Sequence, residues 1–128
     1  MTKNKTRYVD GFVFVVSKKK IKEYIKMAEG GAKIWIKCGA LDYKECIGDD
    51  LYPNMGMPML TFQKLAKIKK GETVWFSYIT YKSKVHRDFV NKKVMAMMDK
   101  EPKKYKDMPM PFDMKRMAYG GFKVVVSN

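Results

Sequence analysis

Three side chains in this sequence have the chemistry of a general acid or base and stand in surroundings that would alter it. Asp10 lies in the apolar segment RYVDGFVFVV. If this segment is a strand, alternate side chains share a face, and Asp10 lies beside Tyr8, Phe12 and Phe14. A carboxylate on an aromatic face must find hydrogen-bond donors or have its pKa raised, which is what a general acid or base requires.

Glu45 and His86 are the other two candidate catalytic residues. Glu45 shares a face of its predicted strand with Tyr43 and Ile47. A second acid can therefore point into the same layer as Asp10. His86 is the only imidazole and stands in SKVHRDF, at the predicted start of a helix. The helix dipole disfavours imidazolium there, which favours a neutral donor and acceptor.

A structural role is the alternative for all three residues. The acids could be hydrogen-bonded to the backbone or paired with an arginine, and a lone histidine at a helix start is often a surface or capping residue. The arginines available for such pairs are Arg7, Arg87 and Arg116, of which Arg87 and Arg116 are also candidate binding residues. The serines and cysteines show no spacing that completes a catalytic triad with His86.

Aromatic side chains could line a pocket for a flat, apolar ligand between a sheet and its helices. The candidates, with core packing as the alternative for most of them, are Trp35, Tyr43, Trp75, Tyr78 and Tyr119. Cys38 and Cys46 have no second cysteine pair and only one distant histidine, so we predict no metal site and no cofactor.

The elements that would position these residues follow from hydrophobic periodicity. A strand is predicted over residues 7–16 and a helix between Ser17 and Gly39, with a second strand over about 41–48. The segments on either side of KKGE, over 62–68 and 73–81, predict a hairpin.

The second half of the chain repeats this pattern. Ser83 predicts the start of a helix that ends near Lys100, and the last strand is predicted over about 117–127. The order β-α-β, an extra strand and β-α-β predicts an α+β fold, a ferredoxin-like split βαβ sandwich with an antiparallel sheet. We expect one domain over residues 1–128, with a basic tail over residues 1–6.

Composition narrows the classes of partner. The 128 residues include 27 Lys or Arg and 13 Asp or Glu, a formal net charge of +14, and 46% are hydrophobic, which excludes intrinsic disorder. Such a charge is typical of nucleic-acid binders, but only three of the basic residues are arginine, so nucleic acid is permitted and not favoured. No apolar run approaches the length of a membrane span, so we expect a cytoplasmic protein with no membrane partner.

Four ordered motifs resemble those of a known family: RYVDGFV, GALDYKECIGDD, GETVWFSYITYKSKVHRDFVNKKVM and MPFDMKRMAYGGF. The chain is similar to the YbaA-like family of uncharacterised bacterial proteins, within the dimeric α+β barrel superfamily. The resemblance implies a ferredoxin-like fold and a dimer whose sheets form a barrel, and it implies no established activity.

The strands independently favour a homodimer, because the first and last are apolar on both sides and helices can cover only one face of the sheet. The sequence is therefore interpreted as a homodimeric small-molecule-binding protein or cofactor-independent enzyme, with its pocket between sheet and helices. Two alternatives stay open: a binding module for RNA or another polyanion, and a dimeric structural or regulatory protein without catalysis.

Overall fold

One antiparallel sheet organises the molecule, which a computed structural model describes over residues 5–52, 56–100 and 110–128. Its strands lie in the order β2-β3-β1-β4. They are β1 (Tyr8–Ser17), β2 (Asp42–Ile47), β3 (Glu72–Tyr81) and β4 (Ala118–Lys123). Because β3 pairs with both β1 and β2, and β1 with both β3 and β4, two β-α-β units interleave. The predicted α+β class, with an antiparallel sheet and β-α-β units, is confirmed.

Two long helices make the connections within these units. Helix α1 (Ile21–Lys37) follows a short 3-10 turn, η1 (Lys18–Lys20), and α3 (Lys84–Asp99) follows β3. Helix α3 begins directly after Ser83, as predicted, whereas Ser17 caps η1 and α1 begins after Lys20. Ser17 Oγ accepts a hydrogen bond from the Lys19 amide in η1, and Ser83 Oγ accepts one from the His86 amide in α3. Another 3-10 turn, η2 (Met114–Arg116), precedes β4.

The predicted hairpin around KKGE is wrong. Its first segment forms a one-turn helix, α2 (Phe62–Leu65), and Thr61 Oγ1 caps that turn by accepting from the Lys64 amide. The hydroxyl cap and the spacing of Phe62 and Leu65 suit a helical turn, and the segment has no neighbouring strand with which to pair. The last strand is also shorter than predicted, because it ends where β1 begins, at the pair Tyr8 and Lys123.

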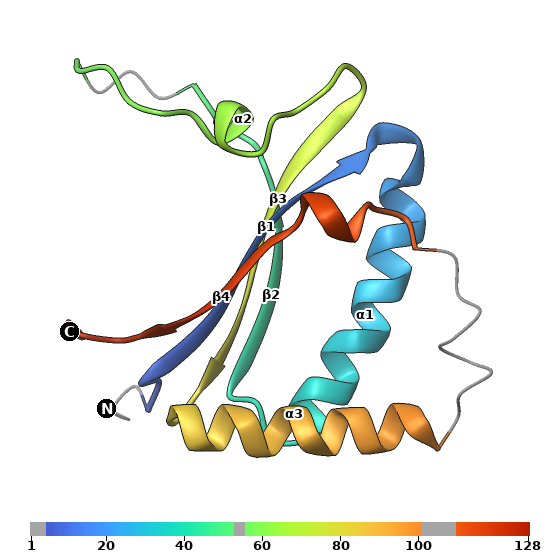
Figure 1. The fold of residues 1–128 in the computed structure, drawn as a ribbon, viewed down its shortest axis with the longest axis vertical. Coiled ribbons are helices and arrows are strands. Elements are labelled where there is room, and N and C mark those ends of the chain that lie inside the picture. Colours follow the sequence, from blue (N-terminus) through green and yellow to red (C-terminus); the bar gives the residue numbers. More distant parts are fainter. Residues whose placement is uncertain (1–4, 53–55, 101–109) are drawn as a thin grey trace.

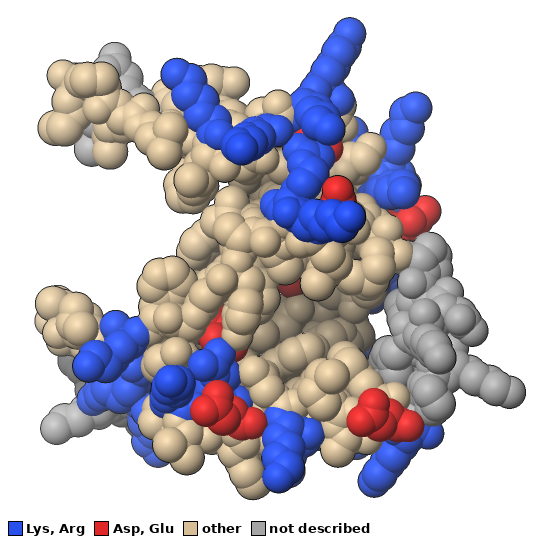
Figure 2. Space-filling view, in the orientation of Figure 1, with Lys and Arg blue, Asp and Glu red and all other residues tan. Residues whose placement is uncertain are grey.

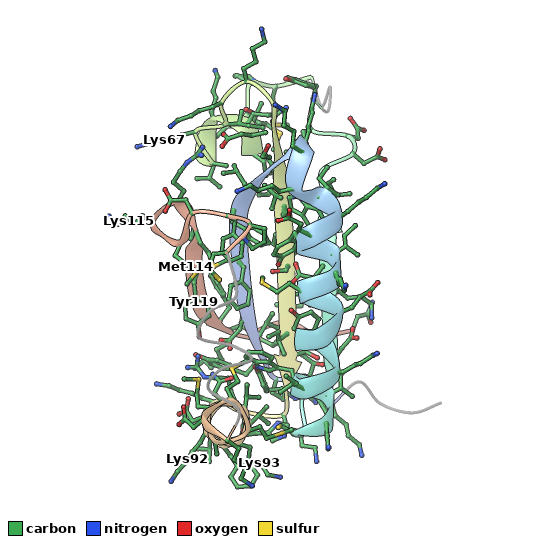
Figure 3. All side chains as sticks on the ribbon, turned by 90° about the vertical axis from the view of Figure 1, so that its right-hand side faces the viewer. Lys67, Lys92, Lys93, Met114, Lys115 and Tyr119 are labelled. Atoms are coloured by element: carbon green, nitrogen blue, oxygen red, sulfur yellow. The ribbon has the colours of Figure 1, made fainter. Side chains whose placement is uncertain are left out.

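The helices cover one face of the sheet, here called the inner face. In Figure 1 α1 runs along the sheet and α3 lies across one end of it, and Figure 3 shows α3 end-on from the side. Among the described residues no helix is both long and apolar enough to cross a membrane.

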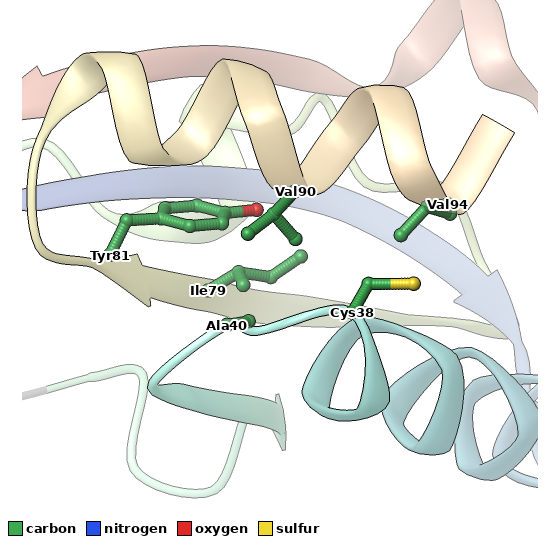
Figure 4. Close-up of a cluster of buried hydrophobic side chains, with 6 residues drawn as sticks. All are labelled: Cys38, Ala40, Ile79, Tyr81, Val90 and Val94. Carbon is green, nitrogen blue, oxygen red and sulfur yellow. The ribbon is translucent and has the colours of Figure 1, made fainter. Parts of the chain in front are cut away.

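The inner face carries two separate hydrophobic clusters. One lies beneath α3 and the end of α1 and contains Cys38, Ala40, Ile79, Tyr81, Val90 and Val94, as Figure 4 shows. The other lies beneath the first half of α1 and contains Phe14, Val16, Tyr24, Ala28 and Trp75. Along β3 the first cluster uses Ile79 and Tyr81 and the second uses Trp75, so Ser77 stands between them.

A polar row therefore crosses the sheet between the two clusters. The pairing register aligns Glu45 on β2 with Ser77 on β3, and Ser77 with Phe12 on β1. Phe12 in turn pairs with Tyr119 on β4. The inner face thus changes from apolar to polar in its middle, between two well-packed regions.

No long helix covers the opposite, outer face of the sheet in Figure 1, where the short α2 lies at one end. Phe76 and Phe122 on this face remain 44% and 61% exposed. The segment that contains α2 projects beyond the sheet, and Figure 2 shows a deep notch between this arm and the body. Large apolar side chains of the arm are also exposed, namely Leu60, Phe62 and Leu65.

Candidate functional site

Glu45 is the centre of the polar row. Its Oε1 accepts hydrogen bonds from the hydroxyls of Tyr24 on α1, at 2.8 Å, and Tyr43 on β2, at 2.9 Å. Its Oε2 is buried and has no hydrogen-bond partner among the described residues. Burial raises the pKa of Glu45 above its ordinary value, although the nearby hydroxyls act to lower it. The protonated acid fits this geometry, since a proton on Oε2 leaves Oε1 free to accept from both tyrosines.

Asp10 lies further along the inner face and is paired with an arginine. Its side chain is 3% exposed, and Oδ1 lies 2.9 Å from Nη1 of Arg87 on α3. Burial raises the pKa of Asp10, and the Arg87 charge offsets only part of that effect. The arginine pair that the sequence left as an alternative is therefore present, and Arg87 is the partner.

Arg87 also donates hydrogen bonds to tyrosine hydroxyls on β1 and β4. Nη1 donates to Tyr119 Oη at 2.8 Å and Nη2 donates to Tyr8 Oη at 3.3 Å. The guanidinium carbon lies 5.0 Å from the centre of the Tyr8 ring, and Nε forms an ion pair with Asp88. One guanidinium thus links α3 to β1 and β4.

The two acids share a face without touching. Asp10 pairs with Ile79, whose other partner is Tyr43, whereas Glu45 lies two residues further along β2. Strand spacing and rise place their Cα atoms about 12 Å apart. Figure 2 shows the molecule hollowed between the sheet and the helices, with acidic atoms visible inside. Tyr119, which is labelled in Figure 3, lies on β4, the strand nearest the viewer in Figure 1.

His86 lies apart from both carboxyl groups. Its Nδ1 accepts a hydrogen bond from the Lys82 amide, and its ring meets the Tyr81 ring edge-on. An accepting Nδ1 leaves the proton on Nε2, which faces Gly39. These contacts fit the capping role that the sequence left as an alternative.

The other predicted residues are divided between the two faces. Trp35 donates from Nε1 to Asn91 Oδ1, and Trp75 is 3% exposed within the second cluster. Tyr78 pairs with Gly11 and Lys44 and therefore lies on the outer face. The expectation that Tyr78 forms a wall of the inner pocket is corrected by this register, since alternate residues of β3 face opposite ways.

Arg116 also lies away from the two acids. It forms a bidentate ion pair with Glu72 at the start of β3, in which Nη2 lies 2.8 Å from Oε1. Its Nη2 also donates a hydrogen bond to the Lys67 carbonyl. This pairing holds η2 against β3, so Arg116 is accounted for by structure.

Sequence reasoning missed several members of the site. Tyr24 and Ser77 complete the surroundings of Glu45, and Tyr8 completes those of Arg87. Ser77 had a detectable signal, because it is the one small polar residue in the alternation of Trp75 and Ile79 on β3. Tyr24 had none, since a tyrosine at helical spacing is usually core. No group of three metal-ligating side chains occurs in the described ranges.

Taken together, these residues place two acids and several hydroxyls on the inner face of the sheet. Oε2 of Glu45 is buried without a partner among the described residues, and Asp10 is held next to a positive charge. The hydroxyls of Tyr24, Tyr43 and Tyr119 are further donors and acceptors.

Fold and sequence place the chain among uncharacterised α+β proteins. Residues 7–114 match the family described as "Protein of unknown function (DUF1428)", and the chain belongs to this family. It is 38% identical over 122 residues to "Uncharacterized protein YbaA" of Escherichia coli strain K12, covering 95% of this chain and 99% of that protein. The identity to the protein of the same name from Shigella flexneri is the same.

A solved structure with a weaker likeness is a putative amidohydrolase/peptidase from Burkholderia cenocepacia. It has 8% sequence identity and a TM-score of 0.29, and the match covers 93% of this chain and 27% of that one. A likeness of this size says nothing about activity.

Proposed function

We propose that this protein binds a small molecule in the hollow between the sheet and the helices, with Glu45 as the main polar group. The observation that carries the proposal is the buried, unpartnered Oε2 of Glu45, whose other oxygen already accepts from Tyr24 and Tyr43. A buried polar atom without a partner costs free energy, and a bound molecule that accepts a hydrogen bond from it removes that cost.

The surroundings of Glu45 favour a neutral, partly aromatic ligand. Phe12 within the polar row and Trp75 beside it supply aromatic surface on the inner face, and a protonated Glu45 offers a hydrogen bond to a carbonyl or similar acceptor. Asp10, beside Arg87, is the second group available for proton transfer. The pair supports acid–base chemistry that needs no cofactor.

The proposal includes a homodimer in which two outer faces meet. Phe76, Phe122 and the arm around α2 expose apolar surface that a second copy would bury. The notch between arm and body in Figure 2 has a shape into which a symmetric partner could fit its own apolar residues.

The test is native mass spectrometry of protein incubated with a small-molecule extract of its own host and then freed of unbound material. We expect a reproducible extra mass on the wild-type protein, absent under denaturing conditions. Glu45→Ala should reduce its occupancy about tenfold, since the donor at Oε2 is lost.

The matched control is Glu29→Ala, the same substitution at an exposed glutamate on α1. It should retain wild-type occupancy. If no mass is retained, or if both variants retain it equally, the inner hollow is not a ligand site, and a structural or regulatory dimer without chemistry becomes the better description.

A further inference from the structure

An open cleft lies at the edge of the sheet, outside the polar row. It has a volume of about 560 Å³ and lies between the start of α3 and the adjoining ends of β1 and β4. Its lining includes Arg7, Tyr8, Ser83, Lys84, Gly121 and Lys123. These residues come from three segments that are distant in sequence, so the cleft exists only in the folded chain.

The charged residues that line this cleft in the described part of the chain are all basic. Arg7, Lys84 and Lys123 contribute three cations, and the described residues that line the cleft include no acid. The acids on the neighbouring helix and strand, Asp88 and Asp10, both lie in ion pairs with Arg87. Figure 2 shows Lys and Arg gathered over the start of α3 and the ends of β1 and β4. The cleft therefore attracts anions.

Hydroxyl donors accompany these cations. Ser83 Oγ accepts from the His86 amide and Tyr8 Oη accepts from Arg87, so each hydroxyl keeps its own hydrogen for a further acceptor. An anion with several acceptor oxygens can use both cations and hydroxyls, and a phosphate monoester provides three such oxygens.

The Tyr8 ring forms one wall of the cleft and is held in place from two sides. A Cβ at residue 121 would lie only 2.9 Å from ring atoms of Tyr8, so glycine at this position lets the ring cross β4. On its other side the ring faces the Arg87 guanidinium. With both sides of the ring covered, Tyr8 contributes its hydroxyl and the edge of its ring to the cleft.

We propose that this cleft binds a small phosphate monoester, with the phosphate held by Lys84, Lys123 and the hydroxyls of Ser83 and Tyr8. The site is separate from the hollow around Glu45, and the proposal does not depend on a ligand in that hollow.

The test is a titration of the full chain with phenyl phosphate, followed by amide NMR shifts at a constant 0.15 M ionic strength. We expect saturable shifts at Ser83, Lys84, Gly121 and Lys123. The double variant Lys84→Gln/Lys123→Gln should weaken binding at least about tenfold, because two charge-assisted contacts are lost.

The matched control is Lys92→Gln/Lys93→Gln, which removes the same net charge from the exposed side of α3, labelled in Figure 3. It should change the affinity less than about twofold. Equal weakening in both double variants, shifts spread over all lysine-rich surfaces, or no saturable binding would each overturn the proposal. Thermal melting of both variants checks that they remain folded, and the Glu45 experiment reads a different site.

Discussion

At the scale of single residues, Glu45 and Asp10 show two ways in which one sheet keeps a buried acid. Glu45 is surrounded by tyrosine hydroxyls, whereas Asp10 lies beside a guanidinium. Burial raises the pKa of both acids, but only Asp10 has a charged partner to offset it. Replacing the ionisable carboxyl of Glu45 by an amide is therefore expected to stabilise the fold. Removing the Arg87 charge beside Asp10 is expected to destabilise it.

Replacing Glu45 by Gln should raise the free energy of unfolding at neutral pH. The folded-state pKa of Glu45 lies above its unfolded value, so wild-type stability falls as pH rises between those two values. Gln keeps an oxygen for Tyr24 and Tyr43 and cannot ionise. Chemical denaturation of both proteins between those two pKa values measures the effect. The free energy of unfolding should fall with rising pH in the wild type and fall less steeply in the variant.

Replacing Glu45 by Ala provides the contrast. Both tyrosine hydroxyls then lose their acceptor, and we expect a loss of about 2 kcal/mol where folded Glu45 is protonated, shrinking as the pH rises and the wild-type acid ionises. Equal stabilities for the Gln and Ala variants would contradict this account of Glu45.

Arg87→Met should destabilise the fold by about 3–5 kcal/mol at neutral pH, because Asp10 is left buried without its partner. The raised pKa of Asp10 then rises further, so the loss should shrink as pH falls and the acid becomes protonated. Urea denaturation at several pH values measures both effects. The double variant Asp10→Asn/Arg87→Met should be more stable than Arg87→Met alone, and a less stable double variant would refute the pairing argument.

At the scale of elements, helix starts were predicted well and tertiary placement was not. Ser17 and Ser83 carry a local signal, since a hydroxyl that accepts an amide works the same way in any fold. The face on which Tyr78 lies depends on strand register, and a strand with apolar residues on both sides does not reveal which one is covered. The Thr61 cap was the overlooked signal for α2.

The pairing within the site was also beyond the sequence. Asp10 and Arg87 are 77 residues apart, and their contact needs both the strand order and the position of α3. The sequence offered three arginines as partners and no means to choose among them. Glu45 was identified as an inner-face acid from alternation alone, and its Tyr24 partner came only from the packing of α1.

Helix α1 also offers a test of its own packing. A Cβ at Gly30 would meet nothing within 4 Å, so Gly30→Ala should raise the free energy of unfolding by about 0.5–1 kcal/mol through helix propensity. Thermal or urea denaturation measures the change. Gly39→Ala is the contrasting variant and should destabilise, because φ at Gly39 is +118°. A less stable Gly30→Ala would mean that α1 is packed on that side.

At the scale of the whole molecule, the sheet has one face under the two long helices and an opposite face with exposed apolar side chains. If two copies meet through the outer face, the wild-type chain should elute as a dimer by size-exclusion chromatography with light scattering. Phe122→Glu should shift it to monomer, because the introduced charge would be buried at the interface.

Phe89→Glu is the matched control, since Phe89 is 58% exposed on α3 and far from the outer face in the chain's topology. It should leave the dimer intact. A wild-type monomer, or dissociation by both variants, would exclude assembly through the outer face of the sheet.

The strand order also decides how the chain responds to mechanical force. β1 and β4 are antiparallel neighbours, and the start of one pairs with the end of the other at Tyr8 and Lys123. Figure 1 shows the start of β1 and the end of β4 on the same side of the molecule. A pull on the two ends therefore loads the hydrogen bonds between β1 and β4 one pair at a time, as in opening a zipper. The Arg87 guanidinium donates to Tyr8 on β1 and to Tyr119 on β4. These hydrogen bonds are the first side-chain link between the two strands that such a force would load.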